Sequence, residues 1–527
     1  MTTGHTESAP TEGRPVPPKD WLPGLAENAK TDLISGFIIF LIALPLCLGI
    51  AIASNAPPMA GIIAGIVAGT LANLFSGSYV TINGPAAGMI VIVAGAVTEL
   101  GFRGALAVGV VAGALQIVLC FARAGKMTGF FPLSVIHGML AGIGLIIMSG
   151  QIHVALGRKN PRAHGFHIFT EIPPSIENLV PETAVVGLAA VLVMALWPRL
   201  GSLAKFAPAP LVAVVVGTAI AEVNGAGLRL DLGGGLLDGF TSPDFSEVLS
   251  GPGLKWLFLY LFVASLESLL TAEAVDKLDP WKRRSDMNRE LLGKGIGNLV
   301  SSAIGGLPMI AEVVRSKANI LIGARTRWSN FFHGTFLAVF VLAVPGVLEL
   351  IPLAALAGVL LVIGFKLAHP NDFLHALKVG KVEFVLMLVT AFTVLLTDLL
   401  IGVATGIVLG LAHAVARGTR PGNLFAPKKT VLEEDGKVTV ALKGALGFHN
   451  FIPLRSVLDS MPPAKTVVLD FSGVHYVDPT VMERLHDFEE AYVTDGGTVV
   501  RVNDGKLRGD TEHPFATRTL ARDVPAA

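Results

Sequence analysis

Two short apolar segments, one in each half of the chain, are broken by Gly and Pro and constrain the fold more than any other feature. The first is residues 78–88, SYVTINGPAAG, and the second is residues 305–316, GGLPMIAEVVRS. Irregular backbone at membrane depth leaves peptide groups without hydrogen bonds, so it persists only where protein buries it or where it lines a polar cavity. Broken helices at matching positions in two halves are typical of a transporter's binding site.

The composition indicates an α-helical, polytopic membrane protein. The chain has 527 residues, of which 52% are hydrophobic and 15% charged, with a mean hydropathy of +0.64. These values are too apolar for an ordinary soluble protein. The apolar stretches between Leu33 and Ala416 suffice for about 14 transmembrane segments. We expect these at residues 33–53, 57–75, 85–98, 104–122, 131–154, 182–198, 209–222, 254–275, 289–304, 313–323, 330–348, 353–367, 382–397 and 401–416.

The ends of the chain are predicted to lie in the cytoplasm. Residues 1–20 are polar and Pro-rich without an apolar core, so they are not a signal peptide, and residues 1–30 form a cytoplasmic tail. Lys and Arg recur in every second loop, as expected if the N-terminus is inside. The two cysteines, Cys47 and Cys120, lie in apolar segments, which excludes a disulfide or metal framework and leaves no cofactor implied. No stripe of basic residues indicates nucleic-acid binding.

After Arg420 the composition becomes that of a soluble domain. Residues 437–442 alternate like a strand, residues 465–471 form a buried-strand run and residues 497–502 supply another strand. Helical stretches are expected near residues 452–460 and 479–493. We therefore predict a small α/β domain over residues 421–510, followed by a tail at 511–527.

These residues resemble the sulfate permease (SulP) family of anion transporters over nearly the whole chain. The resemblance rests on residues 43–46 (ALPL), Gly84-Pro85, Gly297-Asn298 with 305–308 (GGLP), Arg315-Ser316, Asn319 and 323–326 (GART). The tail resembles a STAS domain through residues 469–474 (LDFSGV) and Val477-Asp478. The family implies a transmembrane domain, here residues 31–420, of two inverted seven-segment repeats, with a core moving against a gate. It also implies a homodimer, which we expect to lie in the bacterial plasma membrane.

The two half-helices offer an anion site for a physical reason. Helix N-termini present unpaired amide donors and a partial positive charge, so two aimed at one point would cradle an anion. Arg315 adds a full charge and a planar donor fork, and it falls on the family's arginine, although it could instead pair structurally with Glu312. Two departures from the family, Ala86 for a bulky aromatic and Val314 for a serine, leave the substrate open. The predicted anion site comprises Pro85, Ala86, Ala87, Gly88, Val314, Arg315 and Ser316.

Glu267 and Thr271 lie one helical turn apart in the segment 254–275 and face the same way. A buried carboxylate must be paired, protonated or bound to a cation. The pair could ligate Na⁺, Glu267 alone could relay a proton, or it could brace the half-helices. The spacing resembles the cation site of bacterial sodium-coupled bicarbonate transporters, which carry Asp here. Glu312 could neutralise Arg315, join the cation site or serve as a brace.

The resulting hypothesis is a secondary active anion transporter, not an enzyme, that imports bicarbonate coupled to Na⁺ or H⁺ by alternating access. The alternatives are a proton-coupled sulfate or dicarboxylate carrier, a passive anion channel, or a membrane-anchored regulator acting through the STAS-like tail. In the tail, antagonist relatives carry a phosphorylatable serine after the second aspartate, whereas here Asp478 precedes Pro479 and Thr480. We therefore expect a scaffold there rather than a phosphorylation switch, unless Thr480 substitutes.

Overall fold

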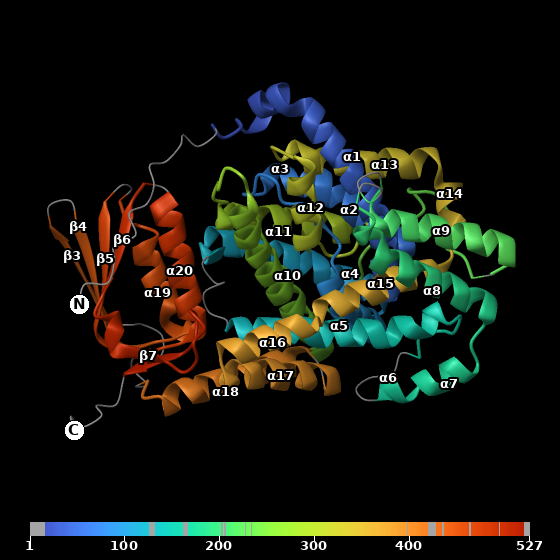
Figure 1. The fold of residues 1–527 in the computed structure, drawn as a ribbon. Coiled ribbons are helices and arrows are strands. Elements are labelled where there is room, and N and C mark those ends of the chain that lie inside the picture. Colours follow the sequence, from blue (N-terminus) through green and yellow to red (C-terminus); the bar gives the residue numbers. More distant parts are fainter. Residues whose placement is uncertain are drawn as a thin grey trace.

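The computed structural model describes residues 16–520 except 126–131, 162–166, 202–203, 205–206, 227, 233, 398, 420–427, 435–436, 463–464 and 495. Within this part of the chain, a large helical bundle is followed by an α/β domain (Figure 1). The helices α19 and α20 of the second domain lie between its sheet and the bundle. The mostly helical architecture with a separate C-terminal domain that contains strands agrees with the predicted fold class.

The bundle consists of helices that are mostly apolar. Its first half contains α1 (Trp21–Ala53), α2 (Pro58–Val67), α3 (Asn73–Phe75), α4 (Ile90–Phe121), α5 (Leu133–Ala155), α6 (His167–Thr170) and α7 (Ile172–Glu177). It continues with α8 (Pro181–Leu196), α9 (Ala209–Asn224), α10 (Gly251–Leu278), α11 (Met287–Ala303) and α12 (Val313–Ile322). It ends with α13 (Trp328–Ala343), α14 (Pro345–Glu349), α15 (Leu353–Leu367), α16 (Pro370–Val379), α17 (Lys381–Leu396) and α18 (Leu399–Ala416).

Eight helical stretches in the described part of the chain are long and apolar enough to cross a membrane. This number is lower than 14 partly because two expected segments, 85–98 and 104–122, follow each other directly within α4. Gly101, with φ of 73°, breaks α4 between them. Other expected segments are shorter helices, such as the 10-residue α12. The count of 14 and the two inverted repeats of seven stay predictions.

Two predicted boundaries differ from the structure. The first helix begins at Trp21, inside the expected tail 1–30, because the Asp20 carboxylate accepts a hydrogen bond from the Trp21 amide and also pairs with Arg327 (Nη2–Oδ2, 2.6 Å). The C-terminal domain extends beyond residue 510, because β8 (Arg518–Leu520) pairs with β5 (Thr466–Val477) in its sheet. Long-range contacts, the Asp20–Arg327 ion pair and the pairing of β8 with β5, thus contribute to both boundaries, and local patterns do not encode them.

The C-terminal domain confirms the predicted strands and helices. Strand β5 pairs in parallel with β4 (Lys437–Leu446) and with β6 (Thr498–Val502). Helices α19 (Phe451–Leu458) and α20 (Pro479–Thr494) cover the sheet, and their apolar faces share one core with it. Sequence patterns did not predict β3 (Lys428–Glu434), which pairs antiparallel with β4, or β7 (Leu507–Gly509), which pairs with β8.

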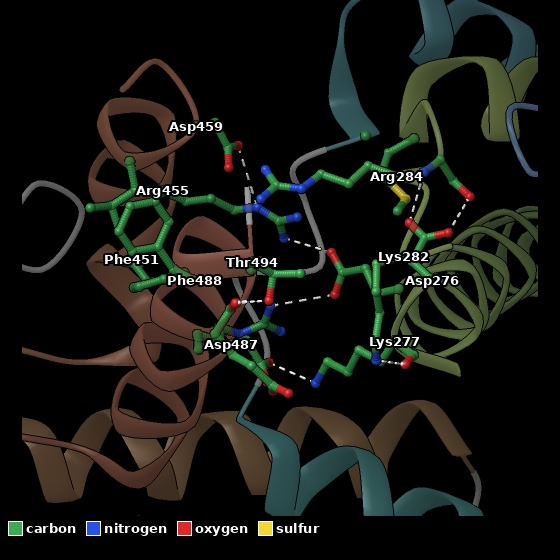
Figure 2. Close-up of a pocket in the computed structure, with 18 of the residues that line it drawn as sticks. Asp276, Lys277, Lys282, Arg284, Phe451, Arg455, Asp459, Asp487, Phe488 and Thr494 are labelled. Carbon is green, nitrogen blue, oxygen red and sulfur yellow. Dashed lines mark hydrogen bonds and ion pairs between the residues drawn. The ribbon is translucent and has the colours of Figure 1, made fainter. Parts of the chain in front are cut away.

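Ion pairs join the C-terminal domain to the C-terminal end of α10. Arg455 of α19 contacts Glu273 (Nη1–Oε1, 2.6 Å), and Asp487 of α20 contacts Lys277 (2.7 Å). Figure 2 shows Lys277 reaching across the cavity toward Asp487. The cavity measures about 410 Å³ and has charged groups of both signs. Because these are balanced, it has the character of an interdomain contact rather than of an anion site.

Thr480, the alternative phosphate acceptor, lies within this interface. Its side chain is 2% exposed and its hydroxyl accepts a hydrogen bond from the Leu133 amide of α5 (3.3 Å). Burial raises the pKa of the neighbouring Asp478 carboxyl to about 7, even though the amides of Val481 and Phe448 donate to it. In this arrangement Thr480 is inaccessible to a kinase.

The interdomain ion pair yields a testable prediction. Arg455→Glu places two carboxylates together at Glu273 and should weaken docking by about 1–3 kcal/mol, the scale of a charge-assisted contact. Faster deuterium exchange in α19 and α20 would report this change. The swapped pair Glu273→Arg with Arg455→Glu should recover part of the slow exchange, because Glu273 also contacts Arg484 (Nη1–Oε2, 3.6 Å) and that contact is lost in the swap. Equal exchange in wild type and Arg455→Glu would assign docking to other contacts.

Candidate functional site

The two broken segments meet as a short antiparallel strand pair inside the bundle. Strand β1 (Asn83–Gly84) pairs with β2 (Ile310–Ala311), and Gly84 lies opposite Ile310. The pairing satisfies backbone groups that would otherwise be exposed at membrane depth. The structure thus brings together the segments that the sequence singled out.

Side chains of α12 brace this crossing. The Ser316 hydroxyl accepts a hydrogen bond from the Ile82 amide (2.9 Å) and donates one to the Glu312 carbonyl (2.6 Å). The Asn319 amide donates to the Val80 carbonyl (2.9 Å). Ser316, predicted as an anion ligand, therefore already binds backbone from both halves.

A helix starts immediately after each strand. Beyond β1, a 3₁₀ turn over Ala87–Met89 leads into α4, and beyond β2, α12 starts at Val313. The first amides of each helix lack intrahelical acceptors, so the two starts place donors and partial positive charge beside the crossing. Ala86 and Gly88 are buried there.

Arg315 links the two halves of the site. Its guanidinium Nη2 donates to the Pro85 carbonyl (2.6 Å) and lies 3.1 Å from Glu312 Oε1. Its Nε and Nη1 have no hydrogen-bond partner among the described residues, although the Cys47 thiol lies beside the group. A Cβ on Gly84 would come within 2.6 Å of Nη1, so glycine is required there for the close approach. Arg315 therefore does pair with Glu312, and the N–H groups of its Nε and Nη1 remain able to donate hydrogen bonds.

Glu267 lies against the start of the first half-helix. A Cβ on Gly88 would overlap both carboxylate oxygens of Glu267, so the carboxylate packs directly on the glycine. Its Oε1 is buried with no hydrogen-bond partner in the described part of the chain. Glu312 is close enough to interact electrostatically with it. A buried carboxylate in this condition requires a proton or a cation.

The other predicted residues divide into two groups. Thr271 is buried one turn after Glu267, and Ala87 is half-buried at the start of the 3₁₀ turn. Val314, in contrast, exposes 65% of its surface, so the bundle does not enclose its side chain. Its predicted role in anion binding therefore rests on its backbone amide.

Sequence reasoning assigned no role to several polar residues that hold the crossing, although Asn298 belongs to one of the motifs of the family resemblance. Ser268 accepts from the Ala311 amide (3.3 Å), and Asn298 accepts from the Met309 amide (2.6 Å). From the sequence, Cys47 was only a cysteine in an apolar segment, whereas in the structure its thiol lies beside Arg315. The available signal was the interruption of apolar helices by single polar residues, which does not reveal their partners.

A cavity of about 340 Å³ lies beside the first half-helix. Ile90 of α4, Ile147 of α5 and Val394 of α17 line it, and Lys255 and Glu99, 3.4 Å apart, add charge. Helices α4, α5 and α17 thus border the space next to the half-helix.

The fold defines a class of protein, a multi-pass membrane transporter, and its candidate site lies where two broken helices meet. The model of the sulfate permease family matches residues 30–390, and the chain belongs to this family of anion transporters. It is not an enzyme family.

Curated relatives with different substrates resemble the chain about equally. The putative sulfate transporter YvdB of Bacillus subtilis is 29% identical over 86% of this chain and 87% of its own length. The bicarbonate transporter BicA of Synechocystis is 28% identical over 94% of this chain and 92% of its own length. Among solved structures, the transmembrane domain of a cyanobacterial BicA gives a TM-score of 0.62 at 26% identity, covering 72% of this chain and 97% of that domain. SLC26A9 gives 0.67 at 18% identity, covering 92% and 86%, which shows the fold alone.

The contact between Gly88 and Glu267 can be tested with one methyl group. Gly88→Ala should displace the carboxylate and lower anion uptake by about ten-fold or more, because small displacements at a site are costly. Gly251→Ala, on the same helix as Glu267 but with open space around its Cβ position, is the matched control. Uptake by both variants in proteoliposomes measures the effect, and equal rates would remove Glu267 from the site.

Proposed function

We propose that this protein is a secondary active transporter that imports bicarbonate together with a cation. The observation that carries the proposal is the buried Glu267 carboxylate, packed on Gly88 at the start of a half-helix and lacking a hydrogen-bond partner for Oε1. A cation bound there would offset the cost of burying the charge. Sulfate is the second candidate substrate, because YvdB, described as a putative sulfate transporter, is as similar to the chain as BicA is.

The anion would bind where the starts of α4 and α12 converge. Backbone amides near Ala87, Gly88 and Val314 would donate to its oxygens, and small side chains would admit a compact ion. Arg315 would contribute its charge and the free N–H groups of Nε and Nη1, since among the described residues only Nη2 is occupied, by Pro85 and Glu312. Glu312 reduces this potential, so its protonation or displacement would strengthen anion binding.

The cation would bind between Glu267 and Thr271, whose oxygens suit Na⁺. Its charge would lie next to the anion, so each ion should strengthen binding of the other. The alternative of proton coupling needs only the Glu267 carboxylate. Either cation would make inward anion movement depend on a gradient, which separates a carrier from a passive channel.

The cellular arrangement completes the proposal. We place the protein in the bacterial plasma membrane as a homodimer, with its N-terminus and C-terminal domain in the cytoplasm. The C-terminal domain is proposed to be a STAS scaffold, consistent with the burial of Thr480. Transport would follow alternating access, with the 340 Å³ cavity beside Ile90 as part of one access route.

Removal of Arg315 tests the anion site. Arg315→Ala should weaken anion binding by about 1.5–3 kcal/mol, the scale of a charge-assisted hydrogen bond, and transport should fall with it. Arg315→Lys keeps the charge but not the planar fork, so it should lose less affinity. Uptake of labelled bicarbonate and sulfate over a concentration series measures both variants. Wild-type affinity in folded Arg315→Ala protein would restrict the residue to structure.

The coupling ion is tested at Glu267 and Thr271. Sodium coupling predicts that Glu267→Gln and Thr271→Ala both raise the Na⁺ requirement or abolish uptake, because each removes an oxygen ligand or its charge. Proton coupling predicts that only Glu267→Gln is severe. Anion uptake is measured against Na⁺ concentration at fixed pH and against pH without Na⁺. A wild-type protein indifferent to both ions would favour a passive pathway.

A further inference from the structure

One face of α11 carries a stripe of polar side chains through the bundle. Glu290, Lys294, Asn298 and Ser301 follow one another at intervals of four, four and three residues, which places them on one side of the helix. Their exposed fractions are 0%, 0%, 2% and 0%. Charged and amide groups are buried at a cost unless they are hydrogen-bonded, so their partners indicate what the stripe does.

The N-terminal part of this stripe holds the first broken segment. The Lys294 ammonium donates to Asn83 Oδ1 (2.7 Å), and Asn83 is the first residue of β1. The Lys294 ammonium also donates to the Glu290 carboxylate, and this carboxylate accepts from the Ser76 hydroxyl and the Gly77 amide. A continuous chain of contacts therefore runs from α11 through Lys294 to the strand before the first half-helix.

The C-terminal part of the stripe holds the second broken segment. Asn298 accepts from the Met309 amide (2.6 Å), next to β2, and donates to Gln116 of α4 (2.8 Å). The Ser301 hydroxyl donates to the Leu307 carbonyl (2.8 Å). A single rigid helix thus fixes the approaches to both strands from one face.

We propose that Lys294 is a positioning residue for anion binding, acting through Asn83 to hold β1 in register against β2. The inference rests on the proposed function, because it assigns Lys294 a role at the anion site described there. Correct register keeps the Pro85 carbonyl within reach of Arg315 and aims the following half-helix at the site. Loss of the Lys294–Asn83 contact would let this turn move without unfolding the bundle.

The contacts distinguish positioning from direct attraction of the anion. Glu290 lies on the same face and is hydrogen-bonded to the ammonium, so the pair is neutral overall. A neutral pair offers little long-range attraction. The contacts do fix the position of the Lys294 ammonium, because Glu290 and Asn83 both bind it. If Lys294 attracted the anion through its charge, Glu290→Gln would free that charge and lower the KM for the anion. Under positioning, Glu290→Gln loosens the chain and raises KM.

The test measures KM and maximal rate for labelled bicarbonate and sulfate in proteoliposomes of the full chain. Lys294→Met should raise KM about 10- to 100-fold, the range seen when residues that orient metal ligands are removed. Asn83→Ala should raise KM similarly, and the double variant should add little, because both changes break one contact. Lys366→Met, at an exposed position, is the matched control and should keep wild-type KM.

Several outcomes would overturn the proposal. These are an unchanged KM in Lys294→Met, independent additive effects of Lys294→Met and Asn83→Ala, or a lower KM in Glu290→Gln. If Lys294→Met does not fold, Asn83→Ala and Glu290→Gln carry the test, because they alter the same chain of contacts. Arg315→Ala separates the two proposals. If it leaves KM unchanged, the proposed anion site fails, while coupling between positions 83 and 294 still decides whether Lys294 positions β1.

Discussion

The strand pairing of β1 with β2 is the interaction on which the site depends. Two broken helices can meet inside a membrane only if the backbone between them is satisfied by protein, and here each segment satisfies the other. The consequence is functional as well as structural. Each break also starts a new helix, and the first amides of that helix have no acceptor within it. The break that has to be buried therefore also creates a region of positive potential.

The sequence predicted where the chain breaks but not how the breaks are held. Gly84-Pro85 and Gly305 to Pro308 are local signals, because these residues change backbone preferences wherever they occur. The contact between Lys294 and Asn83 joins residues separated by 211 positions, and no periodic pattern records it. The same reason explains β3, β7 and β8, whose partners are set by the sheet. Glu267 was found because a single acid in an apolar helix is unusual, whereas its contact with Gly88 required the structure.

Arg315 illustrates how two readings of one residue can coexist. The sequence left open a pairing with Glu312 or a role in anion binding. The structure shows the pairing at 3.1 Å and a second contact with the Pro85 carbonyl. Because Pro85 belongs to the other half of the chain, the arginine joins the two half-helices as it supplies charge. Replacing it therefore alters geometry and potential together, and Arg315→Lys helps to separate them.

Helix α10 is unbroken from Gly251 to Leu278, and it carries groups of two different kinds. Glu267 lies at the proposed site, and Glu273, six residues later, contacts Arg455 of the C-terminal domain. At 1.5 Å per residue these carboxylates are separated by about 9 Å along the axis of one rigid rod. Any tilt or rotation of α10 that shifts Glu267 must also pull on the ion pairs at its other end. The helix therefore couples the position of Glu267 mechanically to the contacts that hold the C-terminal domain.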